Sequence, residues 1–269
     1  MFKKKFYQKQ EKINTHSHKG YDSSEKKPNS MLTSCCVVRH KSSFIQEFLC
    51  HLPMSILALC VSILFVVFFD GALKQLIQPD VKFTIYNDLF HVSHYIHILF
   101  SSFASFFVFR INFVFKNAVW GVFASLINSF FFCTLADIIL PALGGSILGY
   151  DVAIHLCFLH QRDLLNVALF AFFGIFAAYC LSKGDKKFGM LVAEKVHLGH
   201  VWTGCIASLF YLLSQMNITY WADEVGFLLL VLFFSVVIPC IFSDFCVPFL
   251  FSLSSDKKNE FQDQKVDFY

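Results

Sequence analysis

Six apolar runs, each 18–23 residues long, follow one another along this chain. A helix needs about 20 apolar residues to cross the hydrocarbon core of a bilayer, so each run has the length of a membrane span. The runs cover residues 50–69, 89–109, 118–140, 164–181, 197–214 and 225–243. None alternates apolar and polar residues as the strands of a membrane barrel do. The sequence therefore predicts an all-α fold, with a bundle of six transmembrane helices occupying residues 50–251.

The composition supports a membrane protein and excludes several other classes. Hydrophobic residues make up 56% of the chain and charged residues 15%, whereas soluble domains have about 25% charged residues. The chain contains no phosphate-binding nucleotide loop, no Gly-x-Ser-x-Gly elbow and no His-Glu-x-x-His zinc motif. We expect the lipid bilayer as a partner and no nucleic acid, and the sequence identifies no protein partner.

Lysine and arginine predict the orientation of the spans. Of the 22 basic residues, 19 lie in segments 1–49, 110–117, 182–196 and 252–269, and the other three lie in 70–88, 141–163 and 215–224. The positive-inside rule then places both termini in the cytoplasm. We expect a bacterial inner (cytoplasmic) membrane protein, with residues 1–49 as a basic, largely disordered cytoplasmic arm and residues 252–269 as a cytoplasmic tail.

Three histidines, His91, His94 and His97, begin the second apolar run. Ionisable side chains at membrane depth are costly and face protein or water rather than lipid. A spacing of three residues keeps the imidazoles on one broad face of a helix. Because the first and last of them diverge by about 120°, we expect one metal ion to take two of the three.

The orientation predicted above places the three histidines in the outer half of the second span, and further candidate ligands are expected at the same outer end of the bundle. Asp137 is near the end of the third run, and the loop after it carries His155 and His160. Histidine and carboxylate suit zinc, manganese or iron(II). The predicted metal site thus consists of His91, His94, His97, Asp137, His155 and His160. Interfacial histidines, or an Asp–His pair that only holds the bundle together, would explain the same residues without a metal.

Other polar groups are expected at the cytoplasmic end. His197 and His200 begin the fifth run, and Asp244 follows the sixth. We expect these three residues near an exit from the bundle. The third run can end at Pro141, a helix stop signal. Cysteines inside apolar runs, Cys240 among them, are expected to act as small hydrophobes, and the small residues of the fourth and fifth runs to allow close helix packing.

One partial resemblance concerns zinc chemistry. Ser93-x-x-x-His97 and Asp137 resemble part of the pattern of the alkaline ceramidase and adiponectin receptor superfamily. Its members are membrane zinc hydrolases that hold zinc with a Ser/His pair, an Asp and a late His-x-x-x-His. This chain departs from that pattern, because its sixth run has no histidine and it has six runs instead of seven. We therefore assign no family from the sequence.

Three functions are compatible with these residues. The first hypothesis is a transporter, or transport accessory, for a divalent transition metal. The second is a metal-dependent membrane hydrolase in which the same ligands activate a water molecule. The third is a structural or assembly protein without chemistry. The sequence does not decide whether the protein is an enzyme, but it favours a protein that is not an enzyme. A continuous polar path would favour transport, and a closed three-ligand site with one open position would favour hydrolysis.

Overall fold

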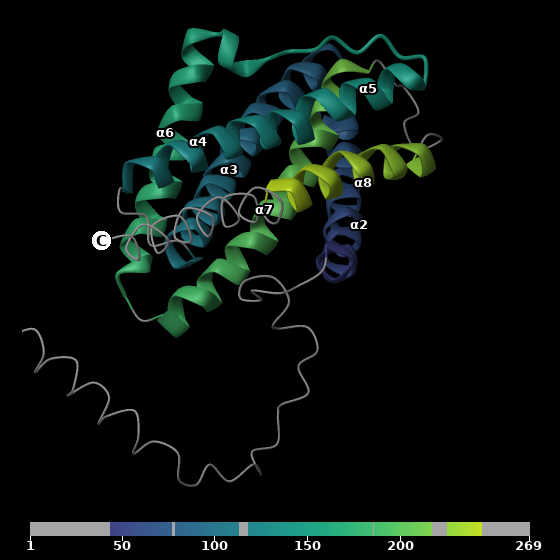
Figure 1. Ribbon diagram of the computed structural model, residues 1–269. Helices are drawn as coiled ribbons and strands as arrows, with labels where there is room; N and C mark the ends of the chain where they lie inside the picture. Colours follow the sequence, from purple (N-terminus) through teal and green to yellow (C-terminus); the bar gives the residue numbers. More distant parts are fainter. Residues whose placement is uncertain (1–43, 77–78, 113–117, 185, 217–224, 244–269) are drawn as a thin grey trace, which may run out of the picture. The chain divides into compact units, whose positions relative to one another are not determined.

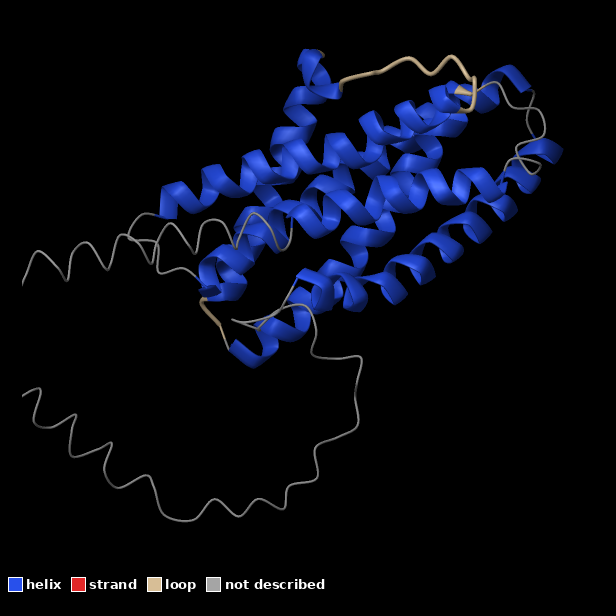
Figure 2. Cartoon of the chain, turned by 45° about the vertical axis from the view of Figure 1, so that its right-hand side comes forward, coloured by secondary structure: helices blue, strands red, loops and turns tan. Residues whose placement is uncertain are grey.

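The described part of the chain is helical. The structure is a computed structural model that describes residues 44–76, 79–112, 118–184, 186–216 and 225–243. These residues contain helices and connecting loops and no strand (Figures 1 and 2). The helices are α2 (Phe44–Leu76), α3 (Pro79–Asn112), α4 (Ala118–Thr134), η1 (Leu135–Ile139), α5 (Leu140–Ile147), η2 (Cys157–Leu159), α6 (Gln161–Ser182), α7 (Lys186–Gln215) and α8 (Val225–Ile241). The predicted all-α fold is confirmed.

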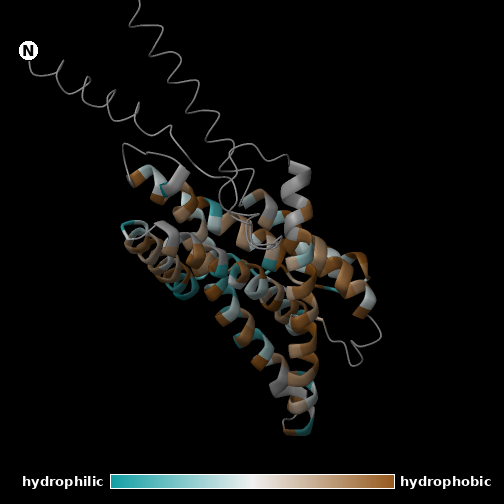
Figure 3. Cartoon of the chain, turned by 90° about the horizontal axis from the view of Figure 1, so that it is seen from below, coloured by the Kyte–Doolittle hydropathy of each residue, from teal (hydrophilic) through white to brown (hydrophobic). Residues whose placement is uncertain are grey.

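Five helical segments in the described part are long and apolar enough to cross a membrane. They are Leu52–Leu73, Phe83–Arg110, Val119–Ile147, Gln161–Ser182 and Leu191–Gln215. The third of them joins α4, η1 and α5 into one continuous helix. A shorter apolar helix, Val225–Cys240, follows. Figure 3 shows the apolar residues along these helices. Their length and composition indicate a multi-pass integral membrane protein.

Helices α3 and α7 form the centre of the bundle. The apolar windows of these two helices are 67% and 78% buried, against 28% for each of α2 and α6. Helix α3 packs against α7, α6 and α4, and α7 packs in addition against α2 and α8. The outer helix α6 exposes large apolar side chains such as Phe172, Phe173 and Phe176. Polar side chains on α3 and α7 are therefore shielded from lipid by the surrounding helices.

A glycine allows α6 to approach α3 closely. A Cβ atom added at Gly174 would lie 2.2 Å from Ser102 Oγ and 2.3 Å from the Leu99 carbonyl oxygen. Ser102 Oγ also donates a hydrogen bond across this contact to the Ala171 carbonyl, 3.1 Å away. Small residues let helix backbones meet in this way within membranes. The expected close packing through small residues of the fourth run is present at Gly174.

The third apolar run does not end at Pro141, so that prediction was wrong. Proline lacks an N–H and its ring clashes with the carbonyl four residues earlier, which here belongs to Asp137. The helix continues past the proline through the π-turn η1, where the Leu140 N–H donates to the Leu135 carbonyl. Turns of this kind are rare and are frequent at functional sites. This one carries a fully buried Asp137.

Other predicted boundaries move by several residues. Helix α2 begins at Phe44, inside the expected basic arm, and the apolar part of α7 begins at Leu191 rather than at residue 197. His197 and His200 therefore lie within a span and not at its start. Residues 1–43, the expected tail 252–269 and Asp244 lie outside the described residues.

Candidate metal centre

Asp137 lies between two histidines of α3 and is fully buried. Its Oδ2 atom is 2.8 Å from His94 Nδ1 and 2.7 Å from His97 Nδ1. A carboxylate oxygen only accepts hydrogen bonds, so both imidazoles donate through Nδ1. The expected contact between the histidines of the second run and Asp137 is thus present. The other carboxylate oxygen, Oδ1, has no hydrogen-bond partner within the described part of the chain.

The carboxylate orients His97. With its Nδ1 proton directed at Asp137, the neutral ring keeps its lone pair on Nε2, which faces away from the carboxylate. Metal-binding histidines are commonly held by a carboxylate in this way, which sets the tautomer and the direction of the ring. Gly204 of α7 provides the space, because a Cβ atom there would lie 2.9 Å from Cε1 and 3.0 Å from Nε2 of His97.

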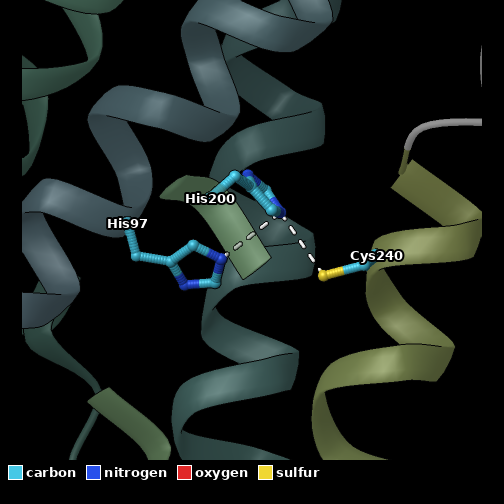
Figure 4. A group of neighbouring side chains, drawn as sticks. All are labelled: His97, His200 and Cys240. Carbon is cyan, nitrogen blue, oxygen red and sulfur yellow. Dashed lines mark hydrogen bonds between the residues drawn. The ribbon is translucent and has the colours of Figure 1, made fainter. Parts of the chain in front are cut away.

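His97 Nε2 points toward two further potential ligands (Figure 4). His200 Nε2 of α7 lies 3.4 Å from His97 Nε2 and also 3.4 Å from Cys240 Sγ of α8. All three ligand atoms lie within 4.8 Å of one another, and all three residues are buried. Three helices therefore contribute one soft or borderline donor each to a single point inside the bundle.

Two of the three separations are close to the edges of a zinc coordination tetrahedron. Zinc bonds to nitrogen at about 2.0–2.1 Å and to sulfur at about 2.3 Å. In a tetrahedron these bond lengths place two nitrogens about 3.3 Å apart and a nitrogen and a sulfur about 3.6 Å apart. The observed N···N distance of 3.4 Å is long for a hydrogen bond and close to that edge. The arrangement suits an ion between the three donors.

The walls around these donors are apolar and tight. His97, His200 and Cys240 line a small pocket together with Phe132, Cys133, Ala136 and Pro239. His97 is 1% exposed and His200 2% exposed. Electrostatic interactions are strong in such surroundings because water screens them little. A cation held here would be stabilised by the Asp137 carboxylate behind His97.

The expected separation of His200 from the histidines of α3 was wrong, because α7 packs along α3 and brings His200 to His97. Cys240 was expected to act as a small hydrophobe, and it is packed in the hydrophobic core. Its thiol also lies 3.4 Å from His200 Nε2. His197 is buried, with its ring stacked on His200 at 6.2 Å, and is not one of the three converging donors. No local motif marks Cys240.

A second cluster lies where the loop before α6 meets α3. One ligand atom each of His91, His155 and Asp163 lies within 4.8 Å of the others, and the three residues are half-buried. His91 Nδ1 is also 3.7 Å from Cys157 Sγ. Burial, with the nearby Asp163 carboxylate, raises the pKa of the Cys157 thiol to about 12. The thiol is therefore protonated at neutral pH.

The six predicted site residues thus divide between two places. His94, His97 and Asp137 belong to the buried centre, which they form with His200 and Cys240. His91 and His155 belong to the loop cluster, which they form with Asp163. His160 is exposed and stacks on the His155 ring at 4.8 Å without joining the converging donors. The sequence predicted one site, whereas the structure places these residues in two clusters, one buried and one half-buried.

Polar side chains continue along the same face of α3 beyond the buried centre. Ser101 and Ser105 follow His97 at spacings of four residues, which keeps them on one helix face. Asn128 Nδ2 donates to Ser105 Oγ at 2.7 Å and to Ser243 Oγ at 2.8 Å. Ser101 Oγ and Asn128 Oδ1 are buried with no hydrogen-bond partner among the residues described. A polar row therefore extends along α3 from His91 to Ser105.

No protein-family model, curated protein or solved structure matches this chain. A function has to come from the geometry of the two clusters and from the helices that hold them.

Proposed function

We propose that this protein is a transporter, or a transport accessory, for a divalent transition metal. One observation carries the proposal: His97 Nε2, His200 Nε2 and Cys240 Sγ lie within 4.8 Å of one another, and the two separations from His200 Nε2, 3.4 Å each, are close to those around a coordinated zinc ion. Intramembrane ionisable residues are costly and mark substrate pathways and functional sites. Five residues of these types form one connected cluster here, since Asp137 contacts both His94 and His97 and the three donors adjoin one another.

The donor set selects among metals. Two imidazoles and a thiolate favour zinc and disfavour manganese, which prefers oxygen ligands. The Asp137 carboxylate stands behind His97 Nδ1 and not among the three converging donors, so the site has less oxygen character than the sequence indicated. Zinc is accordingly the proposed substrate, with iron(II) second.

Transport accounts for the surroundings better than hydrolysis does. A catalytic zinc keeps an open position for water and substrate, whereas the pocket here is small and its other walls are apolar. Polar groups lie on both sides of the centre: the loop cluster around His91 on one side, and Ser101, Ser105 and Asn128 on the other. Polar atoms at membrane depth are tolerated only where protein or a water-filled cavity satisfies them. A path for an ion through the bundle would explain why polar side chains follow one face of α3.

The proposal includes a topology. Helix α8 would be the sixth span, since its Cys240 completes the donor set with two helices from the middle of the bundle. Both termini would then lie in the cytoplasm of a bacterial inner membrane, and the loop between α5 and α6 would face outward, as the distribution of lysine and arginine indicates. The ion would enter at His91 and leave beyond Ser105.

The test measures bound zinc and zinc flux in the full-length protein. The wild type is purified in detergent after zinc-replete growth, its metal content is measured, and it is reconstituted into vesicles carrying an internal zinc indicator. Cys240→Ser and His200→Ala should each remove one equivalent of bound zinc and reduce flux at least tenfold. Each variant deletes one of the three converging protein ligands.

Matched controls separate the centre from general damage. Cys180→Ser changes an exposed cysteine of α6, and His197→Ala changes a buried histidine of α7 that is not one of the three donors. Both should retain the bound zinc. A wild type without stoichiometric metal, or ligand variants with unchanged flux, would contradict the proposal. Zinc bound tightly in the wild type without any flux would rule out a transporter that works alone and would leave the transport-accessory and hydrolase hypotheses.

A further inference from the structure

We infer that the loop cluster is a second metal-binding site, distinct from the buried centre, formed by His91, His155 and Asp163 with Cys157 beside them. One ligand atom from each of the first three residues lies within 4.8 Å of the other two. The His91 Nδ1 to Cys157 Sγ distance of 3.7 Å is close to the about 3.6 Å edge expected between nitrogen and sulfur on zinc. Two imidazoles and a carboxylate therefore converge on one point, and a thiol lies beside one of the imidazoles.

Neighbouring side chains hold the cluster in place. The Tyr95 hydroxyl donates to Asp163 Oδ1 at 2.8 Å, so one oxygen of this carboxylate is held by a hydrogen bond from α3. The Tyr211 hydroxyl donates to the Ala153 carbonyl at 2.6 Å and accepts from the His155 N–H at 3.4 Å. Hydrogen bonds that orient ligands from outside are typical of metal sites. Two tyrosines from α3 and α7 thus fix both the carboxylate and the loop.

The cluster differs from the buried centre in access. Its three ligand residues are half-buried, whereas those of the centre are buried. His91 and His97 are six positions apart on α3, which corresponds to about 9 Å along the helix axis. The two groups of converging ligand atoms have no residue in common, so the clusters are two sites. The half-buried one can exchange its ion with water.

Oxygen ligation distinguishes the two sites chemically. The loop cluster has a carboxylate among its donors, whereas the converging donors of the buried centre are two nitrogens and a sulfur. The loop site should therefore bind zinc more weakly and accept manganese or iron(II) more readily. The loop cluster would bind zinc weakly from water and pass it to the buried centre, which binds zinc more tightly. This loading role rests on the proposed transport function, whereas metal binding at the loop does not.

The test counts metal ions in the full-length protein. Zinc is titrated into the detergent-purified wild type and into His155→Ala, Asp163→Asn and Cys240→Ser. The wild type should bind two equivalents, and each single variant should bind one. Combining Cys240→Ser with His155→Ala should abolish stoichiometric binding. Asp151→Asn changes an exposed carboxylate of the same loop and should keep both equivalents.

The outcomes distinguish this inference from the proposed function. One equivalent in wild type, lost with Cys240→Ser and kept in both loop variants, would overturn the loop site and leave the buried centre standing. One equivalent lost only in the loop variants would support the loop site and overturn the buried centre. In vesicles, His155→Ala should raise KM for zinc flux at least fivefold with kcat little changed. A fall in kcat with KM unchanged would overturn the loading role.

Discussion

At the scale of single residues, Asp137 is the group that joins the two histidines of α3 in the buried centre. One of its oxygens accepts from two imidazoles, and its charge lies in surroundings with almost no water. Removing one partner from a buried charged group costs about 3–5 kcal/mol when the other is left unpaired. The carboxylate therefore both orients His97 and needs a compensating positive charge, which protons on the histidines or a metal ion can supply.

Asp137→Asn should weaken zinc binding at the buried centre by about 10–100-fold, as changes behind a metal ligand commonly do. The amide keeps the volume of the side chain but loses the charge, and its neutral oxygen accepts the two imidazole hydrogen bonds more weakly than a carboxylate oxygen does. Zinc affinity is measured by competition with a chromophoric chelator in detergent, using His155→Ala as background so that one site is observed. Affinity equal to that of the His155→Ala protein would show that the carboxylate does not act on His97.

At the scale of elements, two local irregularities shape the centre. The π-turn η1 absorbs Pro141 and carries Asp137, and Gly204 makes room on α7 for the His97 ring. Neither Pro141 nor Gly204 has a side chain that binds metal, so neither could be recognised in the sequence as part of the site. A proline in an apolar run is ordinarily a helix end, and a glycine in a membrane helix is ordinarily a packing residue. Only the contact between α3, η1 and α7 gives them a role in the site.

Gly204→Ala should displace the His97 imidazole, because the new methyl group would lie 2.9 Å from its Cε1 atom. Overpacking of this kind costs about 1–3 kcal/mol. We expect a lower thermal unfolding midpoint in detergent together with weaker zinc binding. Gly71→Ala is the matched control, since no atom lies within 4 Å of a Cβ added there. Unchanged zinc affinity in Gly204→Ala would show that the ring has room to move.

At the scale of the whole molecule, the bundle places its polar groups on its most buried helices. The centre combines donors from α3, α7 and α8, whose positions in the chain are up to 143 residues apart, from His97 to Cys240. A separate buried contact, in which the Tyr86 hydroxyl donates to Asp70, joins α2 to α3. Lipid-facing surfaces are left to the apolar side chains of helices such as α6. The converging donors of the buried centre thus lie inside the bundle, away from its apolar surface.

Reporter fusions test the orientation. Fusions after residues 80, 150 and 220 should be external, and fusions after residues 115 and 186 should be cytoplasmic, because 19 of the 22 basic residues lie in segments assigned to the cytoplasm. Enzymatic reporters that are active on only one side of the membrane give the readout. An external result at residue 186 would reverse the bundle, and the loop cluster would then receive its ion from the cytoplasm.

The sequence by itself determined the helical fold and the presence of an unusual polar site. Runs of about 20 apolar residues form helices in a bilayer because every backbone polar group must be satisfied within the segment. The contact of the α3 histidines with Asp137 also followed from the sequence, since residues at one depth on neighbouring spans meet. Local information sufficed for these features because length, hydropathy and spacing are properties of a single segment.

The tertiary structure alone decided which residues share a site. The sequence grouped His91 with His97 and separated both from His200, whereas the packing of α7 against α3 brings His200 to His97. Cys240 joins them from a helix whose sequence carries no other sign of function. Pairing of helices depends on the side chains of two surfaces at once, and the rotation of each helix about its axis sets which residues face inward. No single segment contains that information, so the donor set became visible only in the folded bundle.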